Sequence, residues 1–458
     1  MGIYGALATA ITGLRAQSFS LEHISGNIAN AQTTGYKRTE TNFVDLIPDA
    51  PPTRQTAGAV VAFSRATNEV QGDIQTSDNE TFMAINGEGY FVVSQKVGQS
   101  DGQPVFDGTD LYTRRGDFQL DKNGYLVNGA GYFLQGLAID NSTGNIAGST
   151  PSVIRVSNDF LPAKPTTEVT YRANLARFPL TATADSSVPG SELLNLTAFS
   201  NDPRASGDGF VRGDDVTDFL EHSVAGGAIT AFDASGAPVN LQLRWAKIES
   251  ATSGGGAQDV WNLFYMTSTT ATGATPAWQN VGTDYTFGGN GQLNPPITDI
   301  TIDVDVDGVT IDDLIIRHGT DGLTQFADAD GTVQLTDLAQ NGYSAGELVG
   351  IAISDSGRVT TTYSNGQIQE IAAVALAGFN ADNALRKLDG GVFQATNESG
   401  QPIIGATGSI IGSSLEASNV DIADEFTKLI VTQQAYAAAT RIVSTSDEML
   451  QEALNMIR

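Results

Sequence analysis

Apolar residues recur at every seventh position in the last part of the chain, from Ile422 to Ile457. In an α-helix, residues seven apart lie on nearly one line, which drifts by about 20° per repeat. The neighbouring line carries Phe426 and Leu454 but is otherwise polar, so the stripe is narrower than a strict coiled-coil seam. The stretch contains no proline or glycine, and the pattern therefore predicts a helix that continues to Arg458.

A matching stripe lies at the start of the chain, where apolar side chains recur seven apart from Leu7 to Ile28. Glycines at positions 2, 5, 13 and 26 each cost roughly 1 kcal/mol relative to alanine in a helix. The helix predicted over residues 2–30 therefore depends on packing for its stability. The two stripes consist of Leu7, Leu14, Leu21, Ile28, Ile422, Leu429, Tyr436, Val443, Leu450 and Ile457.

Both stripes have to be covered by other protein surface. One interpretation is that two terminal helices pack on a core within the same chain. The remaining faces of both segments, however, are rich in Ala, Ser, Thr and Gln rather than in charge, which suits close helix neighbours better than water. We therefore predict that the ten stripe residues are self-assembly residues, and that the ends become ordered mainly when many copies assemble.

Between the helical ends the sequence predicts mostly β structure. Apolar residues alternate on either side of Lys122-Asn123-Gly124, which is a strong hairpin signal over residues 118–127. Further along, strands are expected at 241–245, 260–265 and 300–306, separated by glycine-rich joints. Asn419 or Asp421 is placed to cap the last helix.

The expected fold class is α+β, in which long terminal helices form a coiled-coil-like axial domain and two mainly β domains are nested between them. The expected domains are residues 1–30 and 412–458 (axial), 31–80 (linker arm), 81–165 and 341–411 (inner β-domain) and 166–340 (inserted outer β-domain). For the linker, composition alone predicts a flexible connector. This nesting would bring both ends of the chain together.

Composition narrows the possible functions. The chain of 458 residues carries a net charge of −28, which argues against nucleic acid because phosphate binding needs a basic face. It has no cysteine, which excludes disulfides and thiolate metal sites. No run approaches the roughly 20 apolar residues of a membrane span, and the N-terminus lacks the basic start of a cleaved secretory signal. Near-neutral ends and an acidic middle suggest that the ends associate while the middle faces water.

One acidic segment imitates a metal site. Asp303, Asp305, Asp307 and Gly308 match the start of an EF-hand loop, but Leu314 stands where a bidentate glutamate is required. The apolar residues between the aspartates favour a strand with one wet face that ends in an Asp-Gly turn. The three histidines stand far apart, and no nucleophile motif accompanies them.

A resemblance to a known family is specific at both ends of the chain. Residues 24–37, Ile-Ser-Gly-Asn-Ile-Ala-Asn-Ala-Gln-Thr-Thr-Gly-Tyr-Lys, resemble the N-terminal signature of the bacterial flagellar axial proteins, the rod and hook family. Gly26 stands where asparagine is usual. Residues 112–118 and 131–136 resemble the inner β-domain of that family, and residues 415–421 match its C-terminal motif. The resemblance covers roughly residues 1–140 and 341–458.

The resemblance implies a structural subunit of the flagellar hook, with no enzymatic activity and no cofactor, that self-assembles into a flexible tube transmitting torque from rod to filament. The implied partners are other copies of the chain, the adjoining rod and hook–filament junction proteins, the hook cap and the export apparatus, without nucleic acid or membrane insertion. The linker arm would dock on a neighbouring subunit. The implied location is the extracellular hook at the basal body, reached without a cleaved signal peptide.

Two alternatives stay open. A distal flagellar rod subunit resembles the hook in its ends and inner domain, although rod proteins generally lack a long inserted domain. A secreted β-rich adhesin or carbohydrate-acting enzyme, with the acidic insert as its working part, comes from a different class.

Overall fold

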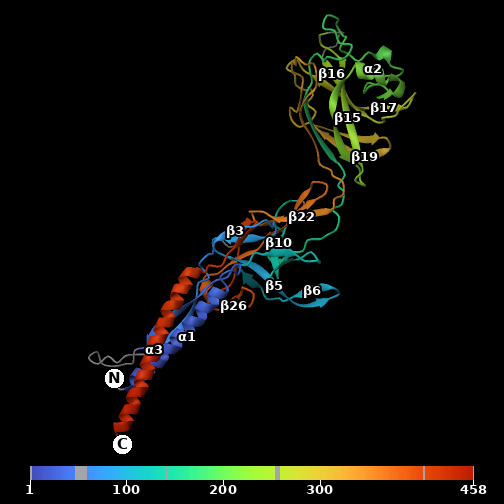
Figure 1. The fold of residues 1–458 in the computed structure, drawn as a ribbon. Coiled ribbons are helices and arrows are strands. Elements are labelled where there is room, and N and C mark those ends of the chain that lie inside the picture. The colour runs from blue at the N-terminus through green and yellow to red at the C-terminus, as the bar shows by residue number, and fades with distance from the viewer. Residues whose placement is uncertain (1–2, 47–58, 141–142, 253–257, 406–407, 457–458) are drawn as a thin grey trace. The chain divides into compact units, whose positions relative to one another are not determined.

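The computed structural model describes residues 3–46, 59–140, 143–252, 258–405 and 408–456 (Figure 1). Backbone contacts divide the chain into two units. The terminal unit comprises Met1–Asp159, Leu348–Tyr363 and Gln367–Arg458, and the inserted unit comprises Phe160–Glu347 and Ser364–Gly366. None of the helices in the described ranges combines the length and the apolar character that crossing a membrane requires.

Two long helices from opposite ends of the chain lie side by side in the terminal unit (Figure 1). They are α1 (Ile3–Ala29) and α3 (Ile422–Met456), and both predicted helices are thereby confirmed. The side chain of Asp421 caps α3, because its Oδ1 accepts hydrogen bonds from the backbone N–H groups of Ala423 (2.8 Å) and Asp424 (3.2 Å). The helices run antiparallel, so both ends of the chain lie together.

The segment after α1 is not the flexible connector that its composition predicts. Strands β1 (Thr39–Leu46) and β2 (Ala59–Ala66) form an antiparallel hairpin that packs along α1. His23 of α1 joins the two, since its ring nitrogens hydrogen-bond with Thr41 Oγ1 (2.8 Å) and Ser64 Oγ (3.0 Å). The prolines that interrupt the sequence pattern, at positions 48, 51 and 52, lie outside the described residues.

The body of the terminal unit is a β-domain built from both halves of the chain. Its largest sheet has the strand order β22-β23-β24-β10-β5-β7-β27-β26, while β3 pairs with β30 and β4 with β29. The hairpin predicted over residues 118–127 is confirmed as β8 and β9. The strands are β3 (Ile74–Thr76), β4 (Met83–Asn86), β5 (Tyr90–Ser100), β6 (Gln103–Phe106), β7 (Leu111–Thr113), β8 (Phe118–Leu120), β9 (Leu126–Asn128), β10 (Tyr132–Ala138), β11 (Ser152–Val153), β22 (Leu348–Ile353), β23 (Arg358–Tyr363), β24 (Ile368–Val374), β25 (Leu376–Gly378), β26 (Arg386–Leu388), β27 (Val392–Gln394), β28 (Ile403–Ile404), β29 (Ser409–Gly412) and β30 (Ser414–Glu416).

In its described part, the inserted unit contains two five-stranded sheets and one short α-helix, α2 (Val216–Glu221). One sheet has the order β13-β17-β16-β15-β14, and the other runs β18-β19-β12-β20 with β21 beside β12. Side chains from both sheets form one core that includes Tyr171, Trp245 and Trp261. The strands are β12 (Glu168–Asn174), β13 (Phe210–Arg212), β14 (Val224–Phe232), β15 (Pro238–Glu249), β16 (Asp259–Met266), β17 (Pro276–Phe287), β18 (Asp299–Val306), β19 (Val309–Arg317), β20 (Leu323–Thr324) and β21 (Gln334–Gln340), and they contain all three predicted strands.

The aspartates that imitate an EF-hand lie on β18 and in the turn after it. Asp303 and Asp305 are exposed, whereas Ile302, Val304 and Val306 between and beyond them are buried. Asp307 accepts hydrogen bonds from Ser268 Oγ and Thr269 Oγ1, both at 2.9 Å, and so ties the turn to a neighbouring loop. The predicted strand is confirmed. Within the described ranges, no three His, Cys, Asp or Glu side chains come together in a way that could hold a metal ion.

Lowering the pH is expected to destabilise the inserted unit through His318. Its ring is buried; Nδ1 donates to Tyr171 O (2.9 Å) and Nε2 accepts from Tyr285 Oη (3.0 Å), so the neutral form fits. Burial lowers the pKa of His318 below its usual 6.5. The unfolded chain therefore takes up the proton first, and stability falls with decreasing pH from about 6.5 by up to about 1.4 kcal/mol per pH unit until the folded pKa is reached.

Tryptophan fluorescence during urea unfolding measures this effect selectively, because all three tryptophans, at 245, 261 and 278, belong to the inserted unit. The stability should be independent of pH above about 7 and fall between about 6.5 and 5.5, and the His318→Gln variant should lose this slope. An equal slope in that variant would assign the titration to another group.

Candidate self-assembly surface

The most deeply buried residues of the paired helices α1 and α3 are mostly small or polar. On α3, Glu425, Thr432 and Ser446 are buried and stand seven or fourteen residues apart. On α1, the buried residues are Ala10, Ala16, Ser20, Ile24 and Asn27. Asn27 Nδ2 donates to Glu425 Oε2 (3.1 Å), which fixes the register at one end of the pair. Small side chains allow the two helices to approach closely.

The stripe residues found in the sequence are less buried than these residues. Leu7, Leu14, Leu21, Ile28, Leu429, Val443 and Leu450 are half-buried, Ile422 and Tyr436 are exposed, and Ile457 lies outside the described residues. The line of Glu425, Thr432 and Ser446 was missed because a search for apolar repeats does not detect it. A seven-residue recurrence of small and polar residues is the signal that could have revealed it.

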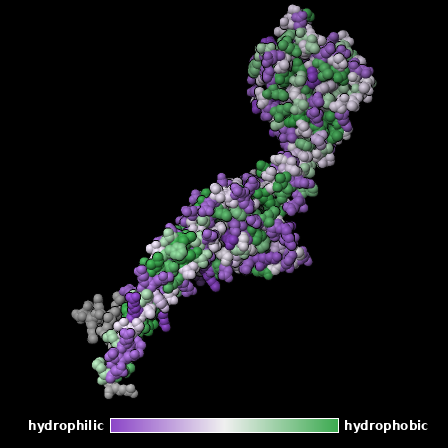
Figure 2. All heavy atoms as spheres, in the orientation of Figure 1, coloured by the Kyte–Doolittle hydropathy of each residue, from purple (hydrophilic) through white to green (hydrophobic). Residues whose placement is uncertain are grey.

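Helix α3 exposes large apolar side chains on two flanks. We call the line of Glu425, Thr432 and Ser446 the contact line. At 3.6 residues per turn, one side of it carries Ile422, Phe426 and Tyr436, and the other side carries Val431, Ile442 and Met449. Their exposed fractions run from 41% for Tyr436 to 60% for Val431. The side opposite α1 is mainly polar apart from Ile430, and carries Gln434, Arg441, Ser444 and Glu448. Figure 2 shows hydrophobic residues at the surface among hydrophilic ones along the helical part of the chain.

A groove runs between hairpin β1–β2 and α3, with α1 as its floor. It has a volume of about 440 Å³ and is lined by residues that include Ile24, Thr41, Phe43, Val431 and Thr432. The hairpin exposes further apolar side chains at Val44, Leu46 and Phe63. Burial lowers the pKa of His23, which lies in this groove. The groove therefore adjoins the flank of α3 that carries Val431.

The histidines of the chain serve structural contacts in three separate places. His23 joins α1 to the hairpin, His318 lies in the core of the inserted unit, and His222 Nδ1 hydrogen-bonds with Asp218 O (2.8 Å) at the end of α2.

Three family models match separate parts of the chain. The model described as flagella basal body rod protein matches residues 7–37, and the model of the flagellar hook protein FlgE/F/G D1 domain matches residues 84–160. The model of the C-terminal part of the flagellar basal body rod FlgEFG protein matches residues 412–456. The first and third models coincide with the two terminal helices and their flanks.

Relatives match over the full length. The chain is 28% identical to flagellar hook protein FlgE of Brucella suis biovar 1 (strain 1330) over 463 residues and 29% identical to that of Rhizobium meliloti (strain 1021) over 474 residues, with 100% of each chain covered. It is 26% identical to the FlgE of Escherichia coli (strain K12), covering 98% of this chain and 100% of the relative. The crystal structure of Helicobacter pylori flagellar hook protein FlgE2 matches with a TM-score of 0.48 and 16% identity, covering 75% of this chain and 100% of that one.

The matches at both helical ends and in the β-domain support one class, the structural proteins of the flagellar rod and hook. Relatives that match over the full length in several organisms are hook proteins, which supports a structural subunit of the flagellar hook. The predicted family is thereby confirmed, and the distal-rod alternative is not favoured. Membership of a structural family also argues against an enzyme.

Proposed function

We propose that copies of this chain polymerise through their terminal helices into the tube of the flagellar hook, which bends while it transmits torque from rod to filament. In this proposal α1 and α3 form a coiled-coil-like axial domain, residues 1–30 and 412–458, that lines the tube. The inner β-domain, 81–165 and 341–411, surrounds it, and the acidic outer domain, 166–340, faces solvent. The ten predicted stripe residues belong to the assembly surface.

The observation that carries the proposal is the pair of apolar flanks on α3. A surface helix of a globular protein presents one apolar stripe to its core and a polar face to water. Here the line that faces α1 is small and polar, while the large apolar side chains lie on both sides of it. Burial of this surface against neighbouring copies is favourable by roughly 25 cal/mol per Å² of apolar area. A helix with two uncovered flanks suits a bundle of several copies.

The composition of the contact line suits a joint that bends. Interdigitated large side chains would fix the register of neighbouring helices, as knobs do in holes. Small residues and hydroxyls, such as those of Thr432 and Ser446, permit limited sliding between helices at lower cost. Torque can then pass along the helices while neighbouring subunits shift against one another.

The remaining partners and the route are part of the proposal. Exposed Val44, Leu46 and Phe63 support docking of the residue 31–80 arm on a neighbouring subunit. The rod, the hook–filament junction proteins, the hook cap and the export apparatus would adjoin the ends of the polymer or deliver its subunits. The chain would reach the extracellular hook without a cleaved signal peptide.

Electron microscopy of the concentrated full chain tests the proposal. Tubes are expected, whereas a chain that lacks residues 1–29 and 422–458 should stay monomeric in the same buffer. The comparison also separates the proposal from a β-rich adhesin, whose binding would survive removal of both helices. The proposal fails if the full chain stays monomeric under all polymerising conditions, or if the shortened chain forms the same tubes.

A further inference from the structure

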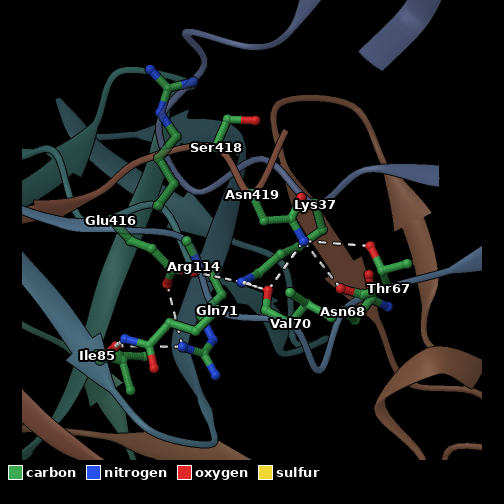
Figure 3. A network of polar contacts seen from close by, with 12 residues as sticks. Lys37, Thr67, Asn68, Val70, Gln71, Ile85, Arg114, Glu416, Ser418 and Asn419 are labelled. Carbon is green, nitrogen blue, oxygen red and sulfur yellow. Dashed lines mark hydrogen bonds and ion pairs between the residues drawn. The ribbon is translucent and has the colours of Figure 1, made fainter. Parts of the chain in front are cut away.

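One buried carboxylate, that of Glu416, joins three distant segments of the terminal unit (Figure 3). Glu416 ends strand β30, shortly before α3 begins. Its Oε1 accepts hydrogen bonds from Lys37 Nζ (2.5 Å) and from the backbone N–H of Gly72 (2.9 Å). Its Oε2 accepts from Arg114 Nη1 (3.3 Å). The exposed fractions of Lys37, Arg114 and Glu416 are only 1%, 3% and 0%.

Each partner of Glu416 belongs to a different structural element. Lys37 lies on the segment that leaves α1, and its Nζ also donates to Val70 O (2.7 Å). Gly72 lies between the β1–β2 hairpin and strand β3. Arg114 follows β7 of the β-domain, where its Nη2 donates to Gly87 O (2.7 Å). Glu416 therefore connects the chain leaving α1, the return from the hairpin and the β-domain at the point where the chain enters α3.

Asn419 adds hydrogen bonds at the same place, where the chain entering α3 crosses the chain leaving α1. Its Oδ1 accepts from the backbone N–H of Arg38 (2.7 Å), and its Nδ2 donates to Val70 O (3.1 Å). Its backbone N–H donates to Tyr36 O (3.2 Å). These bonds lie between Glu416 and α3, so the chain entering α3 is tied to the chain leaving α1 at successive positions.

The segments cross so closely that two glycines are required. A Cβ at Gly72 would lie 2.1 Å from Ala417 O, closer than any real contact. A Cβ at Gly35, which has a φ of +65°, would lie 2.8 Å from the carbonyl carbon of Arg114. The geometry of the crossing is therefore specified by backbone approach as well as by charge.

The charged groups of this crossing are poor contributors to stability. Removing two cations and an anion from water carries a desolvation cost that the ion pairs only partly offset, and apolar replacements of similar size are often tolerated. Burial lowers the pKa of Lys37, which the Glu416 carboxylate opposes. Directional hydrogen bonds to a single carboxylate, in contrast, fix the relative placement of the groups that make them.

We propose that Glu416 is a positioning residue, which sets the direction in which the paired helices α1 and α3 leave the β-domain. The inference deepens the proposed function, because a joint that passes torque from helices to β-domains needs a defined angle between them. It concerns the geometry of a single chain, so it can be tested without polymerisation.

The test measures the helix direction in dilute, monomeric protein. The chain has no native cysteine, so spin labels at Thr445→Cys on α3 and Gln119→Cys on β8 are the only two in the molecule. A rise of about 1.5 Å per residue puts Thr445 about 35 Å from the start of α3, so a tilt of about 10° moves it by about 6 Å. Pulsed electron paramagnetic resonance resolves such a change in the distance distribution.

Two variants separate positioning from stability. In the first, Lys37→Met, Arg114→Met and Glu416→Leu replace the charged set by apolar residues, and in the second Asn419→Ala removes neutral hydrogen bonds only. Both should retain the circular dichroism of the wild type while their distance distributions widen or shift by several ångströms. If a folded triple variant keeps the narrow wild-type distribution, Glu416 does not position the helices.

If the triple variant does not fold, Lys37→Met alone decides, because it removes one hydrogen bond to Glu416 and leaves the Arg114–Glu416 ion pair intact. An unchanged distribution in that variant overturns the proposal, and a widened one supports it. Because the measurement uses monomers, failure of the chain to form tubes would leave this result intact. Conversely, normal tubes with an unchanged label distance would uphold the proposed function and reject the positioning role.

Discussion

Aspartate at Val431, Ile442 and Met449 is expected to abolish polymerisation and to leave the monomer folded. These three residues form one flank of α3 and have exposed fractions of 60%, 50% and 53% in the single chain. Their replacement therefore removes little packing from the monomer. In a tube, each carboxylate would be buried against a neighbouring copy, at a cost of about 3 kcal/mol or more per unpaired charge. One such site alone raises the critical concentration by roughly 100-fold.

The matched control places the same charges on the same helix. Ala423→Asp, Gln434→Asp and Ser444→Asp lie on the polar side opposite α1, and all three positions are exposed. Sedimentation of seeded samples should show no polymer for the flank variant and near-normal polymer for the control, with equal helical content by circular dichroism. Polymer from the flank variant at the wild-type concentration would show that this flank is not an assembly contact.

The stripe residues read from the sequence are a poorer choice for this experiment. Leu429 and Val443 are half-buried beside α1, so aspartate there would damage the monomer as well as the assembly. The seven-residue repeat correctly placed the helix, but the line that faces α1 is defined by Glu425 and Thr432. Contacts between distant residues determine which side of α3 faces α1. The hydrogen bond from Asn27 to Glu425, for example, joins the two ends of the chain, and the periodicity of one segment cannot reveal such a pair.

The sequence predicted elements that are encoded locally. Both helices, the hairpin around Asn123-Gly124 and the strands at 241–245, 260–265 and 300–306 follow from residue periodicity and turn chemistry, and all are present. The family followed from short signatures at the two ends. These features depend on neighbours a few positions away, which a single sequence displays directly.

Pairings between distant segments could not be predicted in this way. Strand β4 follows the pattern of an apolar run before an Asn-Gly turn, yet it pairs with β29 rather than with the next run, β5. Strands β1 and β2 show no alternation of buried and exposed residues that could have predicted them, and prolines stand between them in the sequence. The buried set around Glu416 joins residues more than 300 positions apart, and no local pattern marks a glutamate as buried.

Excision of most of the inserted unit is expected to leave a chain that still folds and polymerises. The two connecting segments lie antiparallel: Lys164 N donates to Tyr343 O and Tyr343 N donates to Lys164 O, both at 2.9 Å. Such a doubly bonded pair is the geometry that closes a two-residue hairpin. Replacing residues 165–342 by Asn-Gly therefore joins the segments through a type I′ turn without moving either of them.

The shortened chain should form tubes of smaller diameter, because the proposed outer domain is missing while both helices and the β-domain remain. Val-Val at the same junction is the matched control, since β-branched residues resist the positive φ angles of this turn and should lower the yield of folded protein. Loss of all folded protein with Asn-Gly would mean that the inserted unit is needed for the terminal unit to fold. Folded but non-polymerising protein would instead assign essential assembly contacts to the inserted unit, and the proposal that the outer domain only faces solvent would be wrong.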